Sequence, residues 1–390
     1  MSWRERLGRN WGRLGMRSEW ITSTIDDICK LVTDGAHNSP KSVDNGYYMA
    51  SVKDFTAYGF DFSNCRKISE ADYLKLKKQG CVPESGDILV GKDGARYFED
   101  VIIYRQKEQP ALLSSIAILR VDDTKVTSEF LYYTLKSPAV KKDVRDNYGS
   151  GSAIPRIVLK DFKRMPISFP SLKEQKKITN ICELLDEKIQ LNNRINNNLE
   201  QQAQAIYQQM FIENQNPNWK EGKLSDLVAV KYGKDHKKLD GGCYPVYGSG
   251  GIMRYVEKPL YTGESVLIPR KGTLNNVMYV NGAFWSVDTM FYTEMLRPNI
   301  AKFVYHFVKG KDLASLNAGS AVPSMTTNIL NAMPLCVPDD KTLSSFEETV
   351  TPMYSQMQEN EKQSANLANI RDTLLPRLMS GELEVSDIDL

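Results

Sequence analysis

Two clusters of basic residues are the part of this sequence best suited to chemistry with a charged partner. Between Ser137 and Pro166 the chain has seven lysines and arginines against three aspartates, and the segment from Lys231 to Lys238 has four lysines and one aspartate. Cations this closely spaced neutralise phosphates, which indicates a nucleic acid as the partner. For each cluster taken alone, an ordinary solvated face is the alternative. The net charge of +2 does not decide between them, because a nearly neutral chain can bind nucleic acid through one surface.

Residues that could support catalysis are scarce. No segment matches the G-x-x-x-x-G-K-[ST] loop that wraps phosphates, and none shows the glycine-rich loop and the Asn/Asp-Pro-Pro-aromatic or Pro-Cys segment of a DNA methyltransferase. The three histidines, His37, His236 and His306, lie far apart in the sequence, which leaves little material for a catalytic triad or a zinc site. The PDDK segment at 338–341 is interpreted as a linker rather than a metal-nuclease motif. We therefore expect a non-catalytic chain without a metal or cofactor of its own.

Length and composition indicate a multidomain globular protein. A chain of 390 residues exceeds what one hydrophobic core usually organises, so two or more domains are expected. No apolar run approaches the roughly 18 residues of a membrane span. The basic N-terminus has no apolar signal region, and the six cysteines show neither CxxC pairs nor disulfide density, so we expect a cytoplasmic location. Met16 offers an alternative start, and residues 1–15 are left out of the fold.

An internal repeat covers the chain. Residues 151–170 and 319–338 both read Gly-Ser-Ala-X-Pro, followed at the same distance by Met-Pro-X-X-X-Pro. GDILVGKDG at 86–94 similarly corresponds to GESVLIPRKG at 263–272, and Trp20 corresponds to Trp219. The offset between corresponding segments shrinks from 199 to 168 residues along the chain, as expected when shared elements are joined by loops of different length. The sequence therefore predicts one fold used twice, with Gly151 and Gly319 in turns.

Each copy is expected to contain an α+β domain followed by a long helix. Upstream of each Met-Pro segment the pattern is one of short apolar strands and turns, and downstream it is helical. The predicted segments are an N-terminal extension at 1–19, a first domain at 20–170, a first helix at 171–214, a second domain at 219–338, a second helix at 341–381 and a tail at 382–390.

The two predicted helices share a heptad pattern. The first should begin at a capping box of Ser171 and Glu174 and extend for roughly 60 Å, and the second at a box of Ser344 and Glu347. The pattern predicts an antiparallel coiled coil within the chain, with apolar ends and a polar middle. An ordinary amphipathic helix packed on its own domain is the alternative. The predicted pairing positions are Ile178, Leu185, Ile189, Asn192, Leu199 and Ile206 in the first helix and Met353, Met357, Asn360, Leu367, Leu374 and Leu378 in the second.

From about residue 16 onward the chain resembles the specificity subunit of a type I restriction-modification system. The resemblance is carried by the first helix at 172–211, YPVYGSGGI at 244–252, the segment at 267–293 and RDTLLPRLMSGEL at 371–383. It implies two target recognition domains, each reading half of a split sequence in double-stranded DNA, separated by two spacer helices. It also implies two modification (methyltransferase) subunits and a restriction (translocase and nuclease) subunit as partners, which would use S-adenosylmethionine, ATP and Mg. Pro352 departs from the pattern and should kink the second helix.

The expected DNA-facing residues are mainly basic. Lysine and arginine neutralise phosphates, and arginine can also bind a guanine through two hydrogen bonds. A coiled-coil scaffold without a nucleic-acid role and a self-contained DNA-modifying enzyme remain as alternative functions. The candidate DNA contacts are Lys92, Arg96, Lys141, Lys142, Arg156 and Lys163 in the first domain and Tyr247, Arg270, Lys271, Asn275 and Asn276 in the second.

Overall fold

A computed structural model describes residues 20–94, 96–149, 156–316, 324–383 and 385. Both Gly-Ser-Ala-X-Pro segments, with the turns predicted at Gly151 and Gly319, lie outside the described residues. Within the described part, no helix combines the length and the apolar character needed to cross a membrane.

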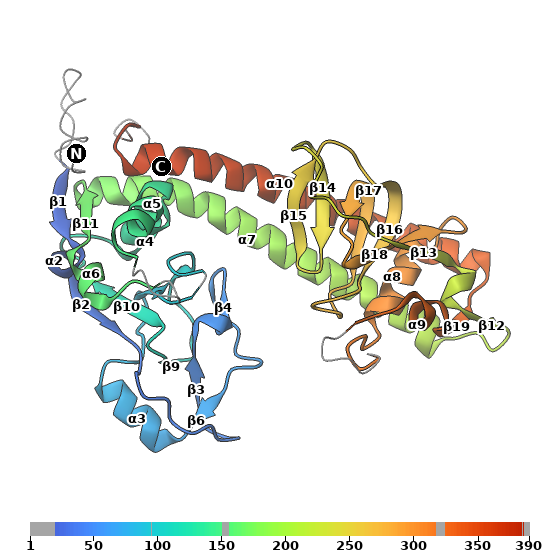
Figure 1. The fold of residues 1–390 in the computed structure, drawn as a ribbon, viewed down its shortest axis with the longest axis horizontal. Helices are drawn as coiled ribbons and strands as arrows, with labels where there is room; N and C mark the ends of the chain where they lie inside the picture. Colours follow the sequence, from blue (N-terminus) through green and yellow to red (C-terminus); the bar gives the residue numbers. More distant parts are fainter. Residues whose placement is uncertain (1–19, 95, 150–155, 317–323, 384, 386–390) are drawn as a thin grey trace. The chain divides into compact units, whose positions relative to one another are not determined.

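The chain divides into two compact units (Figure 1). Residues 1–189 and 364–390 form the first unit, and residues 190–363 form the second. Both divisions fall inside long helices, α7 (Leu172–Gln208) and α10 (Asp340–Met379). Each unit therefore contains one α+β head and part of each helix. The first head is residues 20–170 and the second head is residues 219–338.

An antiparallel four-stranded sheet forms the centre of the first head, in the order β2-β10-β7-β8. Strand β7 is buried along its whole length, as expected for a short apolar run between turns. Helix α4 packs with this sheet in one core. These strands run Cys29–Asp34, Ile116–Val121, Ile88–Gly91 and Val101–Ile103, and the helices α4, α5 and α6 run Ser128–Lys136, Pro138–Asn147 and Leu159–Arg164.

A smaller three-stranded sheet, in the order β6-β3-β9, extends the first head. Its side chains and those of α3 form a separate apolar cluster around Met49, Ile68 and Tyr73. The elements are β3 (Tyr47–Ala50), β6 (Lys67–Ile68), α3 (Glu70–Lys78) and β9 (Ala111–Leu112), with a short hairpin of β4 (Phe55–Thr56) and β5 (Gly59–Phe60) beside them in the sequence.

The second head repeats the sheet of the first and adds a hairpin. Its strand order is β13-β18-β16-β17-β14-β15, and the first four correspond in order and in chain connection to the four strands of the first head. Helix α8 (Ala301–Lys309) takes the place of α4. The prediction of one fold used twice is confirmed. The strands run Val228–Tyr232, Met290–Met295, Tyr261–Pro269, Met278–Ser286, Tyr244–Gly248 and Gly251–Val256.

The Met-Pro-X-X-X-Pro segments close the two heads. In the first head this segment forms β11 (Pro166–Phe169), which pairs antiparallel with β1 (Ile21–Thr24), the strand that begins the head. In the second head β19 (Pro334–Val337) pairs in the same way with β12 (Lys220–Lys223). Even the next backbone bond is repeated, because Ile25 N donates to Met165 O and Leu224 N donates to Met333 O, both at 3.0 Å. The repeated motif therefore joins the end of each head to its beginning.

The starts of the two long helices differ. Helix α7 begins after Ser171, whose Oγ accepts a hydrogen bond from Glu174 N at 3.5 Å and donates one to a Glu174 carboxylate oxygen at 2.9 Å. Ser171 therefore caps the helix as predicted, with the bond to Glu174 running from side chain to side chain. The box predicted at Ser344 is wrong. Helix α10 is capped five residues earlier, at Asp339, whose Oδ1 accepts a hydrogen bond from Thr342 N at 2.9 Å. Helix α10 continues through Pro352 without interruption.

The long helices pair antiparallel within each unit. In the second unit Asn192 Nδ2 donates to Asn360 O at 3.3 Å, and Asn196 Nδ2 donates to Met357 O at 3.1 Å. A later residue on α7 thus contacts an earlier residue on α10, which makes the two helices antiparallel. In the first unit Asp186 pairs with Arg371. The predicted antiparallel coiled coil is confirmed, and the predicted pairing positions are all buried or partly buried.

The alternative, in which each helix packs on its own head, is also correct near the ends of the two long helices. Ile178, Leu375 and Leu378 belong to the core of the first head, and Tyr207 and Phe346 belong to the core of the second. Each head therefore packs against side chains from both helices. The polar middle of the coiled coil lies between these two apolar regions.

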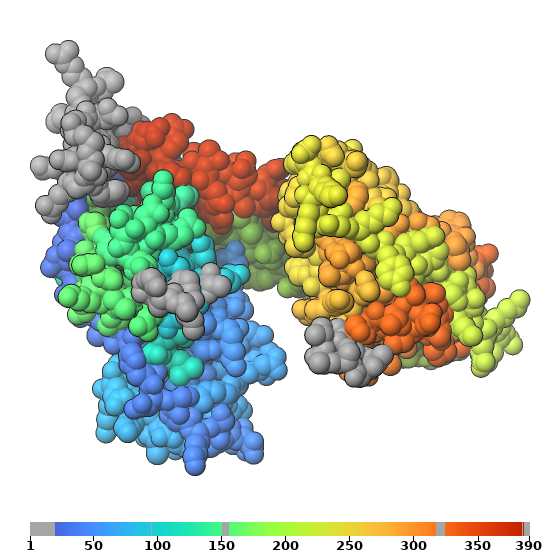
Figure 2. Space-filling model, in the orientation of Figure 1, coloured from blue at the N-terminus to red at the C-terminus, as the bar shows by residue number. Residues whose placement is uncertain are grey.

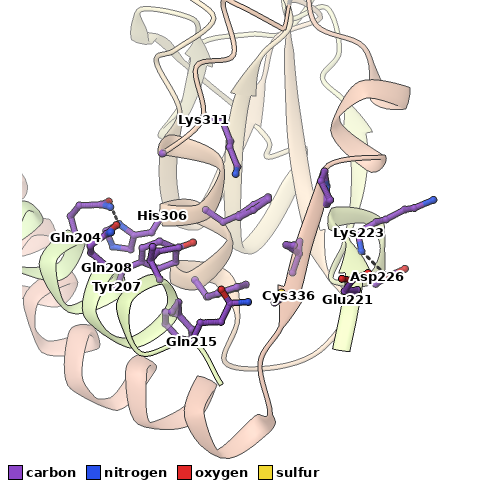
Figure 3. Close-up of a pocket in the computed structure, with 18 residues that line it drawn as sticks. Gln204, Tyr207, Gln208, Gln215, Glu221, Lys223, Asp226, His306, Lys311 and Cys336 are labelled. Atoms are coloured by element: carbon purple, nitrogen blue, oxygen red, sulfur yellow. Dashed lines mark hydrogen bonds between the residues drawn. The ribbon is translucent and has the colours of Figure 1, made fainter. Parts of the chain in front are cut away.

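Polar side chains fix α8 to both helices in the second unit. His306 is fully buried, and its Nδ1 lies 2.7 Å from Gln204 Oε1 while its Nε2 lies 2.9 Å from Tyr354 OH. A neutral imidazole satisfies both contacts if Nδ1 donates to the amide oxygen and Nε2 accepts from the phenol. Burial lowers the pKa of His306 to about 4, although the Glu200 carboxylate opposes this shift. Figure 3 shows His306 and Gln204 turned toward each other beside an open cavity of about 940 Å³.

The corresponding polar contact of the first unit generates a stability prediction. Asp186 is only 5% exposed, and it accepts hydrogen bonds from Tyr133 OH at 2.8 Å and from Arg371. Replacing Arg371 with Ala leaves a buried carboxylate without its cation, which should lower the free energy of unfolding by about 3 kcal/mol. The matched change Arg377→Ala removes an exposed ion pair with Glu382 and should lower it by less than about 1 kcal/mol. Urea unfolding compares the two; equal losses would show that the Asp186 contact has no special role.

A second prediction concerns pH. The unfolded chain protonates His306 near its ordinary pKa of 6.5, whereas the folded chain keeps it neutral down to about pH 4. Because the unfolded state binds the extra proton in this window, stability should fall by up to about 1.4 kcal/mol per unit as the pH drops from 6.5 toward 4. In His306→Gln this part of the slope should disappear, and in the control His37→Gln, at an exposed site, it should remain. Denaturant unfolding at several pH values measures both slopes, and an unchanged slope in His306→Gln would contradict the assignment.

Candidate nucleic-acid interface

The turn after strand β7 in the first head is held by its backbone. Lys92 N donates to Ser115 O at 2.9 Å, and Ile157 N donates to Lys92 O at 3.0 Å. Asp93 forms an isolated antiparallel bridge with Arg156, and Gly94 follows with a φ of 95°. An L side chain is strained in that conformation, so the sequence places glycine there.

The turn after strand β16 in the second head has the same construction. Arg270 N donates to Thr289 O at 2.9 Å, and Met325 N donates to Arg270 O at 2.9 Å. Lys271 forms the isolated bridge with Ser324, and Gly272 follows with a φ of 85°. The predicted correspondence of the two glycine-containing segments therefore extends to the backbone hydrogen bonds, while the side chains differ.

The surroundings of Lys92 do not favour it as a DNA contact. Lys92 is only 7% exposed, and its Nζ lies 3.2 Å from Asp34 Oδ2 at the end of β2. A buried lysine that is paired with a carboxylate has little free charge to offer a phosphate. The sequence motif does not reveal this, because Asp34 is far from Lys92 along the chain and approaches it only through the sheet.

The corresponding arginine of the second head has a different environment. The Arg270 guanidinium lies 5.4 Å from the ring centre of Tyr232, which is 51% exposed, and Arg270 itself is partly exposed. Tyr232 occupies the last position of β13, as Asp34 does in β2. Lys271 beside it is exposed. Tyr232 was not among the predicted contacts, and its place at the start of the KYGKDHKK cluster is the only sequence signal for it.

The other basic candidates of the first head lie mostly in surface ion pairs. Arg96 pairs with Asp100 at 2.7 Å, Lys141 with Glu99 at 2.6 Å and Lys163 with Asp26 at 3.1 Å. Such exposed pairs contribute only about 0 to 1 kcal/mol, so a phosphate can replace the carboxylate. Lys142 and Arg156 are exposed and have no ion pair with any described residue.

The polar candidates of the second head have structural surroundings. Tyr247 and Asn276 line a cavity of about 890 Å³ together with Glu348 and Glu361. Burial, with the Glu361 carboxylate, raises the pKa of Tyr247 to about 12. These carboxylates would repel a phosphate backbone, so this cavity is unsuitable for DNA.

The two asparagines stabilise loops. Asn276 Nδ2 donates to Ser249 O at 2.7 Å, which ties the turn of the β14–β15 hairpin to the loop after Lys271. Asn275 contacts Asp312 and Ala314, each at 3.0 Å. The hairpin itself reaches the surface of the second unit (yellow in Figure 2), where Met253 and Tyr255 are exposed. The sequence did not identify these two side chains, because its glycine-rich context indicates only a turn.

Among the described residues, no group of three or more His, Cys, Asp or Glu side chains could hold a metal ion. The arrangement that the described residues do offer is a pair of corresponding turns, one in each head, with exposed cations nearby. Such a surface can bind phosphates and, through arginine, base edges.

Comparisons with known proteins agree with this organisation. A family model described as the type I restriction modification DNA specificity domain matches residues 17–201 and again residues 216–361. The MjaIX type I restriction enzyme specificity subunit of Methanocaldococcus jannaschii is 22% identical over 67% of this chain and 71% of its own length. A putative type I specificity subunit of Mycoplasma pneumoniae is 24% identical over 68% of this chain and 76% of its own length.

A solved structure has the same fold. It is the S subunit of a type I restriction-modification system from M. genitalium, which is 19% identical and has a TM-score of 0.54 over 94% of this chain and 97% of that chain. The family model matches once for each head, as the internal repeat requires. The chain therefore belongs to the type I restriction-modification DNA specificity family and contains two copies of its domain.

Proposed function

We propose that this chain reads a bipartite sequence in double-stranded DNA, one half with each head, and directs a methyltransferase to it. The observation that carries this proposal is the construction of two heads on one backbone plan with different side chains at the corresponding turns. A shared scaffold positions each head in the same way, and the differing side chains let each head bind a different half-site. Family membership supplies the DNA-recognition role.

Within each head, the exposed cations near the strand-end turns are the proposed backbone contacts. Lys142 and Arg156 serve the first head, and Arg270 and Lys271 serve the second. Phosphate contacts fix the position of the protein on the duplex, and contacts to base edges give sequence preference. Lys92 is excluded from this set because Asp34 neutralises it.

The paired helices are the proposed spacer between half-sites. Helix α7 has 37 residues and α10 has 40, which corresponds to roughly 55 to 60 Å of helix at about 1.5 Å per residue. The asparagine contacts in the middle of the coiled coil fix one pairing, because a shifted register would bury amides without partners. A fixed pairing keeps the length of the spacer constant.

The proposed partners are two methyltransferase subunits and a restriction subunit with translocase and nuclease activity. In the second unit, helix α7 carries a short exposed apolar row, with Leu191 at 43% and Ile195 at 36% exposure four positions apart. A helix of a partner subunit would bury such a row. S-adenosylmethionine, ATP and Mg are proposed to act in the partner subunits, and the complex is proposed to work in the cytoplasm.

The test is to express the chain with its methyltransferase subunit and to map the methylated bases of the host DNA. Two short specified blocks separated by an unspecified gap of fixed length are expected. Methylation or cleavage by the purified chain alone would instead support a self-contained enzyme. Loss of all sequence preference in the intact complex would support the scaffold alternative.

A prediction follows from the antiparallel pairing. Residues 189–195 and 357–363 lie opposite each other around the contact of Asn192 with Asn360, so removing both segments deletes matching layers and keeps the heptad register. Each helix should become about 10 Å shorter. The gap in the methylated sequence should shorten by roughly three base pairs, at about 3.4 Å each. Methylome mapping measures the gap, and an unchanged gap in a folded variant would refute the spacer role.

A further prediction concerns exchange of one head. Replacing residues 219–338 with the head of a relative of different specificity should change one block of the target. However, Tyr207 and Phe346 of the helices belong to the core of the second head, so this exchange mismatches that core. An exchange of residues 190–363, the whole second unit, should give the same new block with higher thermal stability. Methylation mapping and melting curves compare the two chimeras; if both blocks change together, the heads do not read independently.

A further inference from the structure

Four corresponding positions surround the strand-end turn of each head, and their charges differ. The sheet pairings establish the correspondence, because Asp34 pairs with Ala117 at the end of β2 just as Tyr232 pairs with Phe291 at the end of β13. We call these four positions the turn quartet. It consists of Asp34, Lys92, Asp93 and Arg156 in the first head and of Tyr232, Arg270, Lys271 and Ser324 in the second.

Two of the quartet positions form the same backbone bridge in both heads, but the cationic residue stands on opposite sides of that bridge. In the first head Asp93 pairs with Arg156, so the cation lies on the segment that enters α6. In the second head Lys271 pairs with Ser324, so the cation lies instead in the turn that follows β16. Each bridge therefore presents one exposed cation, from opposite sides.

The other two positions determine how much further charge the turn carries. In the first head Asp34 neutralises Lys92, whereas in the second head Tyr232 lies beside Arg270 and adds no charge. Formal charges of −1, +1, −1 and +1 cancel in the first quartet, and charges of 0, +1, +1 and 0 give +2 in the second. Neither Arg156 nor Lys271 has an ion pair with a described residue.

The turns also leave room for a ligand to approach the backbone. A Cβ placed on Gly94 would meet no atom of the described residues within 4 Å, so these residues do not block an approach to the turn. At Gly272 the nearest side chain among the residues that the structure describes is Ser249, at 2.8 Å. A glycine with positive φ beside an exposed cation is an arrangement that phosphate-binding turns use, because the backbone can come close to the oxygens.

We propose that the turn quartet is the phosphate-contact site of each head, with Arg156 as the contacting cation in the first head and Lys271 in the second. The cation lies on opposite sides of the backbone bridge in the two copies, while the bridge that positions it is the same. This inference rests on the proposed DNA-reading function and adds where each head holds the DNA backbone. It also implies that the second head supplies the larger share of salt-dependent affinity, because its quartet carries two net cations.

The experiment uses the complex of the full chain with its methyltransferase subunit. Binding of a fluorescent duplex that contains the methylated target is measured by anisotropy between about 50 and 300 mM salt, beside a duplex of scrambled sequence. Arg156→Ser and Lys271→Ser should each weaken binding to both duplexes and reduce the slope of log K against log salt by about one. The control Lys30→Ser, which removes an exposed lysine paired with Asp123, should leave the slope unchanged.

Reciprocal double variants test whether the cation works from either side of the bridge. Asp93→Lys with Arg156→Ser gives the first head the arrangement of the second, and Lys271→Asp with Ser324→Arg does the reverse. Both should recover the slope of the unmodified complex, because each bridge again presents one cation. Melting curves confirm that every variant is folded.

The outcomes separate the two proposals. If the unmodified complex does not prefer its target to the scrambled duplex, the DNA-reading function fails. If it does prefer the target but the single variants keep the full slope, the turn quartet is not the phosphate site. A slope that falls in the single variants and is not restored in the double variants would contradict the equivalence of the two sides of the bridge.

Discussion

The rest of the structure depends on cores that each head shares with both long helices. Ile178 and Leu378 come from opposite helices and from distant parts of the sequence, yet they belong to one apolar cluster with the sheet of the first head. Tyr207 and Phe346 do the same in the second. Because the helices are part of the hydrophobic core, a head cannot rotate on its helices without exposing apolar surface. The orientation of each head on its own helix segments is thereby fixed by packing rather than by linkers.

Between these cores the coiled coil is polar. Asn192, Asn196 and Asn360 hydrogen-bond across the helices where a more stable coil would bury leucine or isoleucine. Their contribution is mainly to the choice of partner and register, since amides that lose their partners are penalised. Stability therefore comes from the ends of the helices and pairing accuracy from the middle. This division suits a protein in which the length of the helices matters.

Repetition and heptad spacing made most of the fold predictable, because both are local patterns that survive divergence. The helix pairing, the strand-rich heads and the closing role of the Met-Pro segments follow from them. The start of α10 could not be predicted from these patterns, because Asp339 and Ser344 are both acceptable caps and only the structure decides between them. The burial of Lys92 was also hidden, because its partner Asp34 is brought beside it by the sheet. Charge clusters located the right regions, but not which cations remain exposed.

The division of the chain also determines the order in which it can fold during synthesis. The second unit is continuous, so all of its residues are available for folding once Gln363 has emerged from the ribosome. The first unit is not, because its core includes Leu375, Leu378 and Val385 near the very end of the chain. The first head precedes these residues in the sequence, so part of its apolar surface stays uncovered until residues 375–385 have also emerged. Nascent chains of this protein would need protection by chaperones at their beginning rather than at their end.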